Sequence, residues 1–308
     1  MKEPLSRKTR FNLSYLWRAL ALLLFACVAF WGAVQPSSLN KIQRENLQPS
    51  TTAWQLTNPA VNREIEGYAS LTSVPVGGNI DLFVNTQDPT YSLTVFRMGW
   101  YGGKGGRKVL GPQKLTGVHQ VTPDPDPISG AFECHWINPF RIHVPTSWVS
   151  GIFLAKLHGN TSGKESYIVF TVRDSRKADL VFEQSVITYQ AYNPWPGGPV
   201  DGWIGASLYE FNTNPALVGH PGYRRGQDGG IQAENVTFSR PYRTDLIANT
   251  PVTIYSQNVS PYYGMGAGDF LRNIAPAAMD FGMVRWLEHE GYNVTYITDV
   301  DVHEDVGQ

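Results

Sequence analysis

The most diagnostic stretch of this 308-residue chain is Met283-Val-Arg-Trp-Leu-Glu-His-Glu-Gly-Tyr-Asn-Val-Thr-Tyr-Ile-Thr-Asp-Val-Asp-Val-His303. Apolar residues recur at helical spacing through Val284 and Leu287, while charged residues such as Glu288 are predicted to face away. Gly291 stands where a helix C-cap belongs, and residues 293–298 follow as a predicted strand. A helix that leads through a short connection into a strand is half of a parallel α/β repeat.

A second stretch of the same character lies upstream: Glu183-Gln-Ser-Val-Ile-Thr-Tyr-Gln-Ala-Tyr-Asn-Pro-Trp195. Residues 178–182 and 185–189 are predicted strands, and a Gly/Pro/Trp-rich segment from 193 to about 232 predicts a functional loop or an insertion. We therefore predict an α/β domain over residues 176–308. Parallel sheets place their active groups at the carboxyl ends of strands, so a site is expected there.

Residues 64–175 carry a different pattern, of short β-branched and aromatic runs bounded by Gly, Pro or Asp. Strands are predicted at 65–70, 80–86, 91–98, 106–110, 114–121, 133–143, 151–158 and 166–173. Their regular spacing, without a helical period, predicts an antiparallel β-sandwich. Residues 36–63 are polar and contain three prolines, which is typical of a tether.

The N-terminal segment, residues 1–35, has the pattern of a membrane anchor. Basic residues precede an uncharged apolar run, Ala19–Val34. The run is slightly shorter than the roughly 20 residues of a bilayer span, and no small-residue cleavage site follows it. An uncleaved anchor is therefore favoured over a cleaved signal peptide. Basic residues on its N-terminal side predict a folded part that faces the periplasm or the outside, or that is secreted if cleavage occurs.

Composition narrows the function classes. The chain is 42% hydrophobic and 17% charged, which is typical of a folded protein, and its net charge of −1 gives no electrostatic basis for binding nucleic acid.

The two cysteines, Cys27 and Cys134, lie in different segments, so no internal disulfide is expected. Cys134 is interpreted as a small buried apolar residue rather than a reactive thiol.

The glycine-rich segment Arg97–Arg107 does not fit a phosphate loop, because Gly105 follows Lys104 where Ser or Thr is needed and no helix follows. Its glycines are predicted to serve positive-φ positions in a strand connection. Trp100 and Tyr101 are either core residues or a carbohydrate-stacking platform.

Two groups of side chains are candidates for chemistry. Asp299, Asp301 and His303 would share one face of an extended chain just past a strand's carboxyl end, which makes them weak catalytic candidates; the alternative is a solvated strand exit. Tyrosines surround the other α/β segment, at positions Tyr189, Tyr192 and Tyr209. A hard trivalent cation could bind such phenolates, but the residues alone favour core and loop aromatics.

Five segments together resemble the large (beta) subunit-like family of N,N-dimethylformamidase: residues 65–70, 96–107, 188–193, 239–242 and 286–303. The resemblance implies an Ig-like sandwich followed by a flavodoxin-like domain of the class I glutamine-amidotransferase type. It also implies an iron ion held by two tyrosines and a glutamate, acting as a Lewis acid on an amide carbonyl. Tyr192, or alternatively Tyr189, resembles the first tyrosine ligand and Tyr209 the second, with Asn193 and Trp195 as candidate substrate-binding residues.

The family also carries a His-x-Glu element on a later strand, which supplies the carboxylate ligand and a catalytic histidine. That element is expected beyond Gln308, so we predict an incomplete, C-terminally truncated fragment of an extracytoplasmic, metal-dependent hydrolase of small amides. One alternative is a non-catalytic cell-surface or glycan-binding protein that uses Trp100, Tyr101 and Trp136. Another is a subunit completed by a separately encoded partner or by a second copy of the chain.

Overall fold

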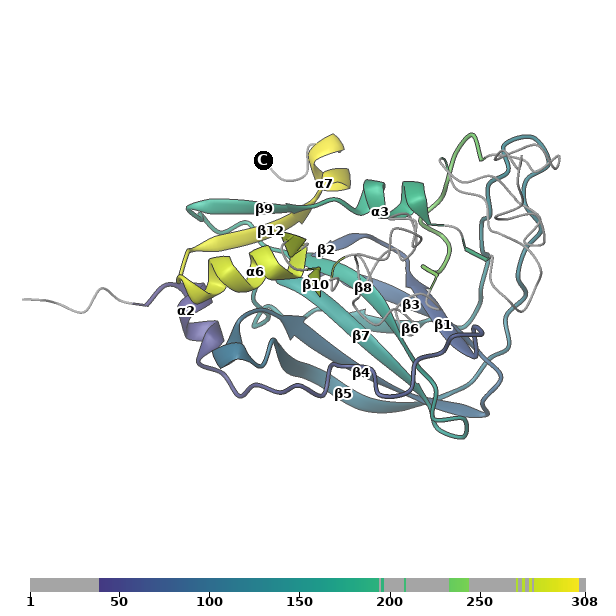
Figure 1. Cartoon of the computed structure of the whole chain (residues 1–308), viewed down its shortest axis with the longest axis horizontal. Helices are drawn as coiled ribbons and strands as arrows, with labels where there is room; N and C mark the ends of the chain where they lie inside the picture. The colour runs from purple at the N-terminus through teal and green to yellow at the C-terminus, as the bar shows by residue number, and fades with distance from the viewer. Residues whose placement is uncertain are drawn as a thin grey trace, which may run out of the picture. The chain divides into compact units, whose positions relative to one another are not determined.

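The computed structural model describes residues 39–193, 195–196, 208, 233–243, 270, 273–274, 277–278 and 280–304. Contacts between Cα atoms divide the chain into two units, residues 1–39 and 40–308, and the elements below belong to the second. Within its described part, this unit consists of mixed β-sheets with few helices (Figure 1). The predicted β-rich character is therefore confirmed.

The largest sheet has five strands. Their order is β2 (Ser73–Pro75), β8 (Glu165–Arg173), β7 (Gly151–Gly159), β4 (Thr90–Met98) and β5 (Gly106–Thr116). Neighbours are antiparallel except for β2, which runs parallel to β8. The predicted runs 106–110 and 114–121 are thus one strand, β5, which ends at Thr116.

A second, antiparallel sheet has the order β1 (Ile65–Ala69), β3 (Asn79–Thr86) and β6 (Phe140–His143). Of the run predicted at 133–143, only the last four residues form a strand.

The five-stranded sheet is covered on both faces, as alternate residues of β7 illustrate. Phe153 and Ala155 belong to a core shared with β1 and β3, whereas Ile152 and Leu154 belong to a second core shared with the C-terminal elements. Successive side chains of a strand point to opposite faces, so a strand buried on both sides has a continuous apolar sequence. This explains why β7 and β8 are almost wholly buried.

The C-terminal elements are built around a parallel strand pair, β9 (Leu180–Gln184) and β12 (Val294–Thr298). The other elements of this part are α3 (Val186–Tyr192), β10 (Asn273–Ile274), β11 (Ala277–Ala278), α6 (Asp280–His289) and α7 (Asp299–His303). Figure 1 shows α3 and α7 at the same end of the β9–β12 pair. The predicted helix–strand step is confirmed as α6 and β12, joined through Gly291 at φ +80°.

The predicted strand at 185–189 is wrong, because these residues begin helix α3. β-Branched residues such as Val186 and Ile187 favour strands, but this preference is weak against tertiary packing. Val186 and Tyr189 are three residues apart, and as a helix they bury both side chains in the same core.

The predicted tether is also partly wrong. Within it, Lys41–Asn46 form a short helix, α2, whose N-cap Asn40 makes a reciprocal capping box with Gln43. Ile42 is fully buried, and Asn40 donates to the Gly291 carbonyl at 2.8 Å. This segment therefore packs against the α6–β12 connection.

The predicted localisation is contradicted. Among the residues that the structure describes, no helix is long and apolar enough to cross a bilayer. Helix α6, the longest described, has ten residues where a span needs roughly 20. The predicted anchor itself, Ala19–Val34, lies outside the described residues.

Candidate active site

The candidate site lies at the carboxyl edge of the β9–β12 pair. Thr298 pairs with Gln184 at the last position of the ladder, so both following helices begin at the same edge. Asp299 opens α7, and its two carboxylate oxygens lie 3.0 and 3.2 Å from the backbone nitrogen of Ile187 in the first turn of α3. A negative charge is favoured at that position, because the first amides of a helix have no partner within the helix.

Asp280 joins this edge from a third element. Helix α6 leads back to the start of β12, so its first residue, Asp280, returns to the carboxyl edge. There the Tyr189 hydroxyl donates to the Asp280 carboxylate. Burial, followed by the negative charge of Asp299, raises the pKa of Asp280 to about 6. Burial also raises the pKa of Asp299.

Tyr189, Asp280 and Asp299 thus form one cluster, which we call the edge triad. A buried carboxyl group whose pKa lies near neutrality can exchange a proton with a ligand at physiological pH. Sequence reasoning named Asp299 as a catalytic candidate and Tyr189 as an alternate metal ligand, and it did not name Asp280. Asp280 lies at the start of the predicted helix, but no sequence pattern links that position to Tyr189, which lies 91 positions away.

The other two C-terminal candidates lie elsewhere. Residues 299–303 form helix α7 rather than an extended chain, because the Thr298 side chain caps the helix. In a helix, Asp301 is turned away from Asp299. Asp301 completes the capping box, accepts from the Ser73 hydroxyl at 2.5 Å and pairs with Arg173 at 3.3 Å, which is a structural role. His303 is exposed at the end of α7.

Of the tyrosine candidates, Tyr189 alone has a described side chain. Tyr192 is the last residue of α3, but its side chain lies outside the described part, and so does all of Tyr209. Their predicted role as metal ligands stays a prediction.

The two predicted substrate-binding residues are buried. Asn193 donates to Gln190 at 2.7 Å and to the Pro241 carbonyl at 2.9 Å, and accepts from the backbone nitrogens of Trp195 and Arg243. The Trp195 indole donates to Glu66 of β1 at 2.9 Å. The Trp195 bond ties the segment after α3 to β1, and both side chains are almost fully enclosed.

The glycine-rich segment has a structural role as well. Its Gly102, Gly103 and Gly105 have φ of +62°, +89° and +84°, as predicted for a tight strand connection. Arg97 of this segment forms a fully buried ion pair with Glu288 of α6 at 2.7 Å. Burial disfavours the charged guanidinium, but the charge of Glu288 raises the pKa of Arg97 well above its ordinary value. The prediction that Glu288 faces away from the core is therefore wrong.

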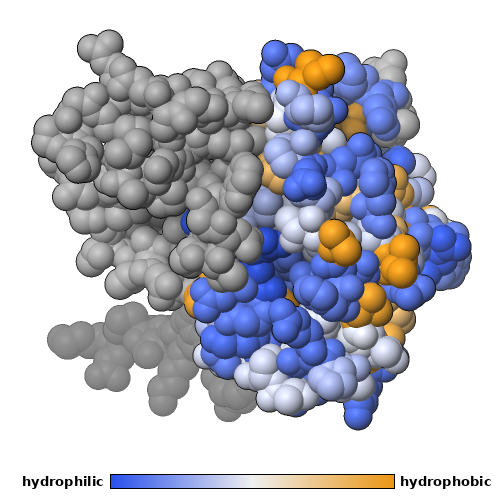
Figure 2. All heavy atoms as spheres, turned by 90° about the vertical axis from the view of Figure 1, so that its right-hand side faces the viewer, coloured by the Kyte–Doolittle hydropathy of each residue, from blue (hydrophilic) through white to orange (hydrophobic). Residues whose placement is uncertain are grey.

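The aromatic residues considered for glycan stacking do not form an exposed platform. Tyr101 and Trp136 are buried, at 1% and 6% exposure. Trp100 is contacted by the His289 ring, with centroids 4.4 Å apart, and by the Arg285 guanidinium at 5.3 Å. On the face drawn in Figure 2, the apolar residues among the coloured atoms form small separate groups.

Cys134 is also buried, as predicted, and burial raises the pKa of its thiol.

The described residues do not by themselves fit the implied iron ion. Within this part of the chain, no three His, Cys, Asp or Glu side chains gather as a metal-binding group. Tyr189, the tyrosine candidate with a described side chain, is hydrogen-bonded to Asp280.

The family described as N,N-dimethylformamidase beta subunit-like, C-terminal, matches residues 92–308, more than two thirds of the chain. Comparison with curated proteins gives no match. The matched range contains both partners of the Arg97–Glu288 pair and the whole edge triad.

Proposed function

The chain belongs to the N,N-dimethylformamidase beta subunit-like family, and from this premise we propose that it is a hydrolase of the carbon–nitrogen bond of small amides. The observation that carries the proposal is the edge triad: two carboxyl groups and a phenol from three separate elements, brought to the carboxyl edge of a parallel strand pair. That edge is where α/β sheets commonly bind ligands.

The triad has the groups that amide hydrolysis needs. Asp280, with a pKa near 6, holds a proton for part of the time at neutral pH and can deliver it to the leaving nitrogen. Asp299 can accept the proton of the attacking water, whose oxygen forms the new bond to the carbonyl carbon as the carbon–nitrogen bond breaks. Tyr189 orients the Asp280 carboxyl group. The products are a carboxylic acid and an amine.

The finer parts of the family resemblance belong to the proposal. They include an Ig-like sandwich over residues 64–175 and a flavodoxin-like domain over residues 176–308, which the two packed sheets and the parallel β9–β12 pair support. They also include an iron ion held by Tyr192 and Tyr209, which when bound would polarise the amide carbonyl. We also propose that the chain assembles with a second subunit or with a second copy of itself. The mass of the purified protein in solution tests this assembly.

The test measures amine release by the full chain, with its metal content determined, from formamide, N-methylformamide, N,N-dimethylformamide and acetamide. Asp280→Asn and Asp299→Asn should each lower kcat/KM by about 10²-fold or more, since general acid–base catalysis typically contributes that much. Glu290→Gln, at an exposed position in the turn after α6, is the matched control and should leave the rate unchanged.

Absence of turnover with every amide, in protein loaded with iron and then with zinc, would refute the proposed activity. Turnover that survives both aspartate substitutions would refute the assignment of the edge triad.

A further inference from the structure

Strand β9 has a partner strand on one side only. Its sheet consists of β9 and β12, and Figure 1 shows β12 on one side of β9 and no strand on the other. The Leu180 amide donates to the Asn293 carbonyl at 3.3 Å, so the backbone groups of every second residue from Leu180 onward face β12. The backbone groups of the alternate residues, Val181 and Glu183, face the other way, and they have no hydrogen-bond partner among the described residues.

The side chains along this edge are apolar and exposed. Leu180 is 38% exposed and Val181 is 58% exposed. Edge strands of natural proteins usually avoid pairing with other chains by carrying Lys, Pro or a bulge. The edge strand of the five-stranded sheet, β5, has Lys108, Pro112, Lys114 and register shifts against β4, whereas β9 has none of these features. β9 is therefore open to pairing with another strand.

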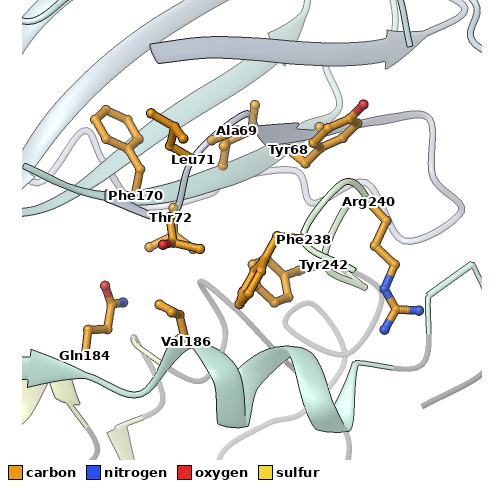
Figure 3. A pocket seen from close by; sticks show the side chains of 13 residues that line it. Tyr68, Ala69, Leu71, Thr72, Phe170, Gln184, Val186, Phe238, Arg240 and Tyr242 are labelled. Carbon is orange, nitrogen blue, oxygen red and sulfur yellow. The ribbon is translucent and has the colours of Figure 1, made fainter. Parts of the chain in front are cut away.

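The face of β9 toward the five-stranded sheet is already covered. Gln184 is fully buried there and accepts from the Thr171 hydroxyl of β8 at 2.7 Å. In Figure 3 the Gln184 side chain is directed toward Thr72 and lies on the same side of the view as Phe170 of β8. A partner can therefore reach β9 along its edge, through the outward backbone groups.

A second copy of the same strand fits this edge in an antiparallel register centred on Phe182. In that register the five residues of β9 overlap along their full length, and Val181 of each copy lies opposite Glu183 of the other. Residues paired in this way exchange both N–H···O bonds, so every outward backbone group of both copies gains a partner. The arrangement has two-fold symmetry and closes on itself.

Charge favours this register over its neighbours. Moving the two-fold axis to Val181 would place Glu183 opposite Asp179, and moving it to Glu183 would place two Glu183 carboxylates opposite each other. Like charges that lie directly opposite each other destabilise a strand pair. With the axis at Phe182, Glu183 instead meets the apolar Val181, and Asp179 meets Ser185, whose hydroxyl can donate to it.

We propose that two copies of this chain pair through β9, antiparallel and centred on Phe182, to form one continuous sheet in the order β12–β9–β9–β12. The inference rests on the proposed assembly, for which it names the partner and the surface. It does not rest on the proposed hydrolysis.

The first experiment measures the mass of the full chain by sedimentation over a range of concentrations, together with hydrogen exchange of the backbone amides. A dimer is expected, with slower exchange at Val181 and Glu183 as it forms. Val181→Pro removes an outward N–H, and proline is tolerated at such positions of edge strands. This variant should fold and raise the Kd of the dimer at least about tenfold.

The sign of a charge at position 181 tests the register. Val181→Glu places a carboxylate opposite Glu183 of the second copy and should raise the Kd about tenfold, while Val181→Lys should leave the dimer at least as tight at low salt. The matched control is Val121→Glu, because Val121 is 80% exposed and lies outside β9, and it should leave the Kd unchanged. Val181→Glu, at an exposed position, keeps the test valid if Val181→Pro does not fold.

Three results would overturn the proposal: a monomer at every concentration, a dimer that neither Val181→Pro nor Val181→Glu weakens, or a dimer that Val181→Lys weakens as much as Val181→Glu does. A monomer that releases amine from amides would refute this inference and leave the proposed hydrolysis standing. A dimer with the expected responses but without turnover would do the reverse.

Discussion

Breaking the buried ion pair between Arg97 and Glu288 should be among the most damaging single changes in this chain. Neither side chain has exposed surface, and Arg97 also donates to the backbone carbonyls of Val149 and Ser150 at 3.2 and 2.8 Å. Arg97→Met would leave the Glu288 carboxylate in the core with neutral donors only. Removing one partner of a buried pair costs about 3–5 kcal/mol.

That cost is large against the 5–15 kcal/mol that stabilises a typical domain. At about 2–4 °C per kcal/mol for a chain of this size, the melting temperature should fall by roughly 6–20 °C. The assay is urea unfolding followed by tryptophan fluorescence and by circular dichroism, with coincident transitions as the check for two-state behaviour.

The matched control is Arg141→Met. Arg141 pairs with Asp81 at the same 2.7 Å distance, but its side chain is 67% exposed, so the expected loss is about 0.2–1 kcal/mol. The double variant Arg97→Met/Glu288→Leu should lose much less than the sum of the two single variants, since no unpaired charge remains. The argument from burial fails if Arg97→Met lowers the free energy of unfolding no more than Arg141→Met does. It also fails if the losses caused by Arg97→Met and Glu288→Leu are additive in the double variant.

Three further predictions concern the site and its surroundings. Folding raises the pKa of Asp280 from 3.8 to about 6, so the folded chain binds the Asp280 proton more tightly than the unfolded chain does. The free energy of unfolding should therefore fall by about 1–3 kcal/mol as the pH rises from 4 to 6. Asp280→Asn should remove that part of the pH dependence in urea titrations at pH 4, 5, 6 and 7, and an unchanged slope would contradict the assigned environment. Asp301→Ala should lower the free energy of unfolding by about 2–4 kcal/mol, because the helix cap and the hydrogen bond from Ser73 are lost. Its kcat, measured at a temperature where the variant stays folded, should be unchanged. A loss of kcat like that of Asp299→Asn would instead make Asp301 part of the site. Cys134 should resist a thiol reagent in native protein and react fully in urea, and rapid native labelling would disprove its burial.

Much of the fold could be predicted from the sequence where local pattern and tertiary environment agree. The helix–strand step around Gly291 was predictable because the helical period, the positive-φ glycine and the strand run are all local signals. Strands β1, β3, β4, β7 and β8 were predictable for the same reason. The family resemblance then identified the family that matches residues 92–308.

The candidate site was predictable only in part. Asp299 was named as a candidate from its place after a strand, and Tyr189 was named as an alternate metal ligand from the family resemblance. Asp280 was missed because its partner, Tyr189, lies 91 positions away in the chain and no local pattern records such a contact. Asp301 was grouped with Asp299 because an extended chain was assumed, whereas the Thr298 side chain caps a helix at this point.

The sequence alone therefore determined most of the longer strands, the α6–β12 step, the turns that need glycine and the family. Only the tertiary structure decided which polar residues are buried, as Glu288 and Gln184 illustrate: one is paired with Arg97 across 191 positions, and the other has an amide nitrogen without a partner among the described residues. The physical reason is that periodicity measures how apolar side chains are arranged along one element. The burial of a polar group depends instead on which distant element covers it, and that is set by packing of the whole unit.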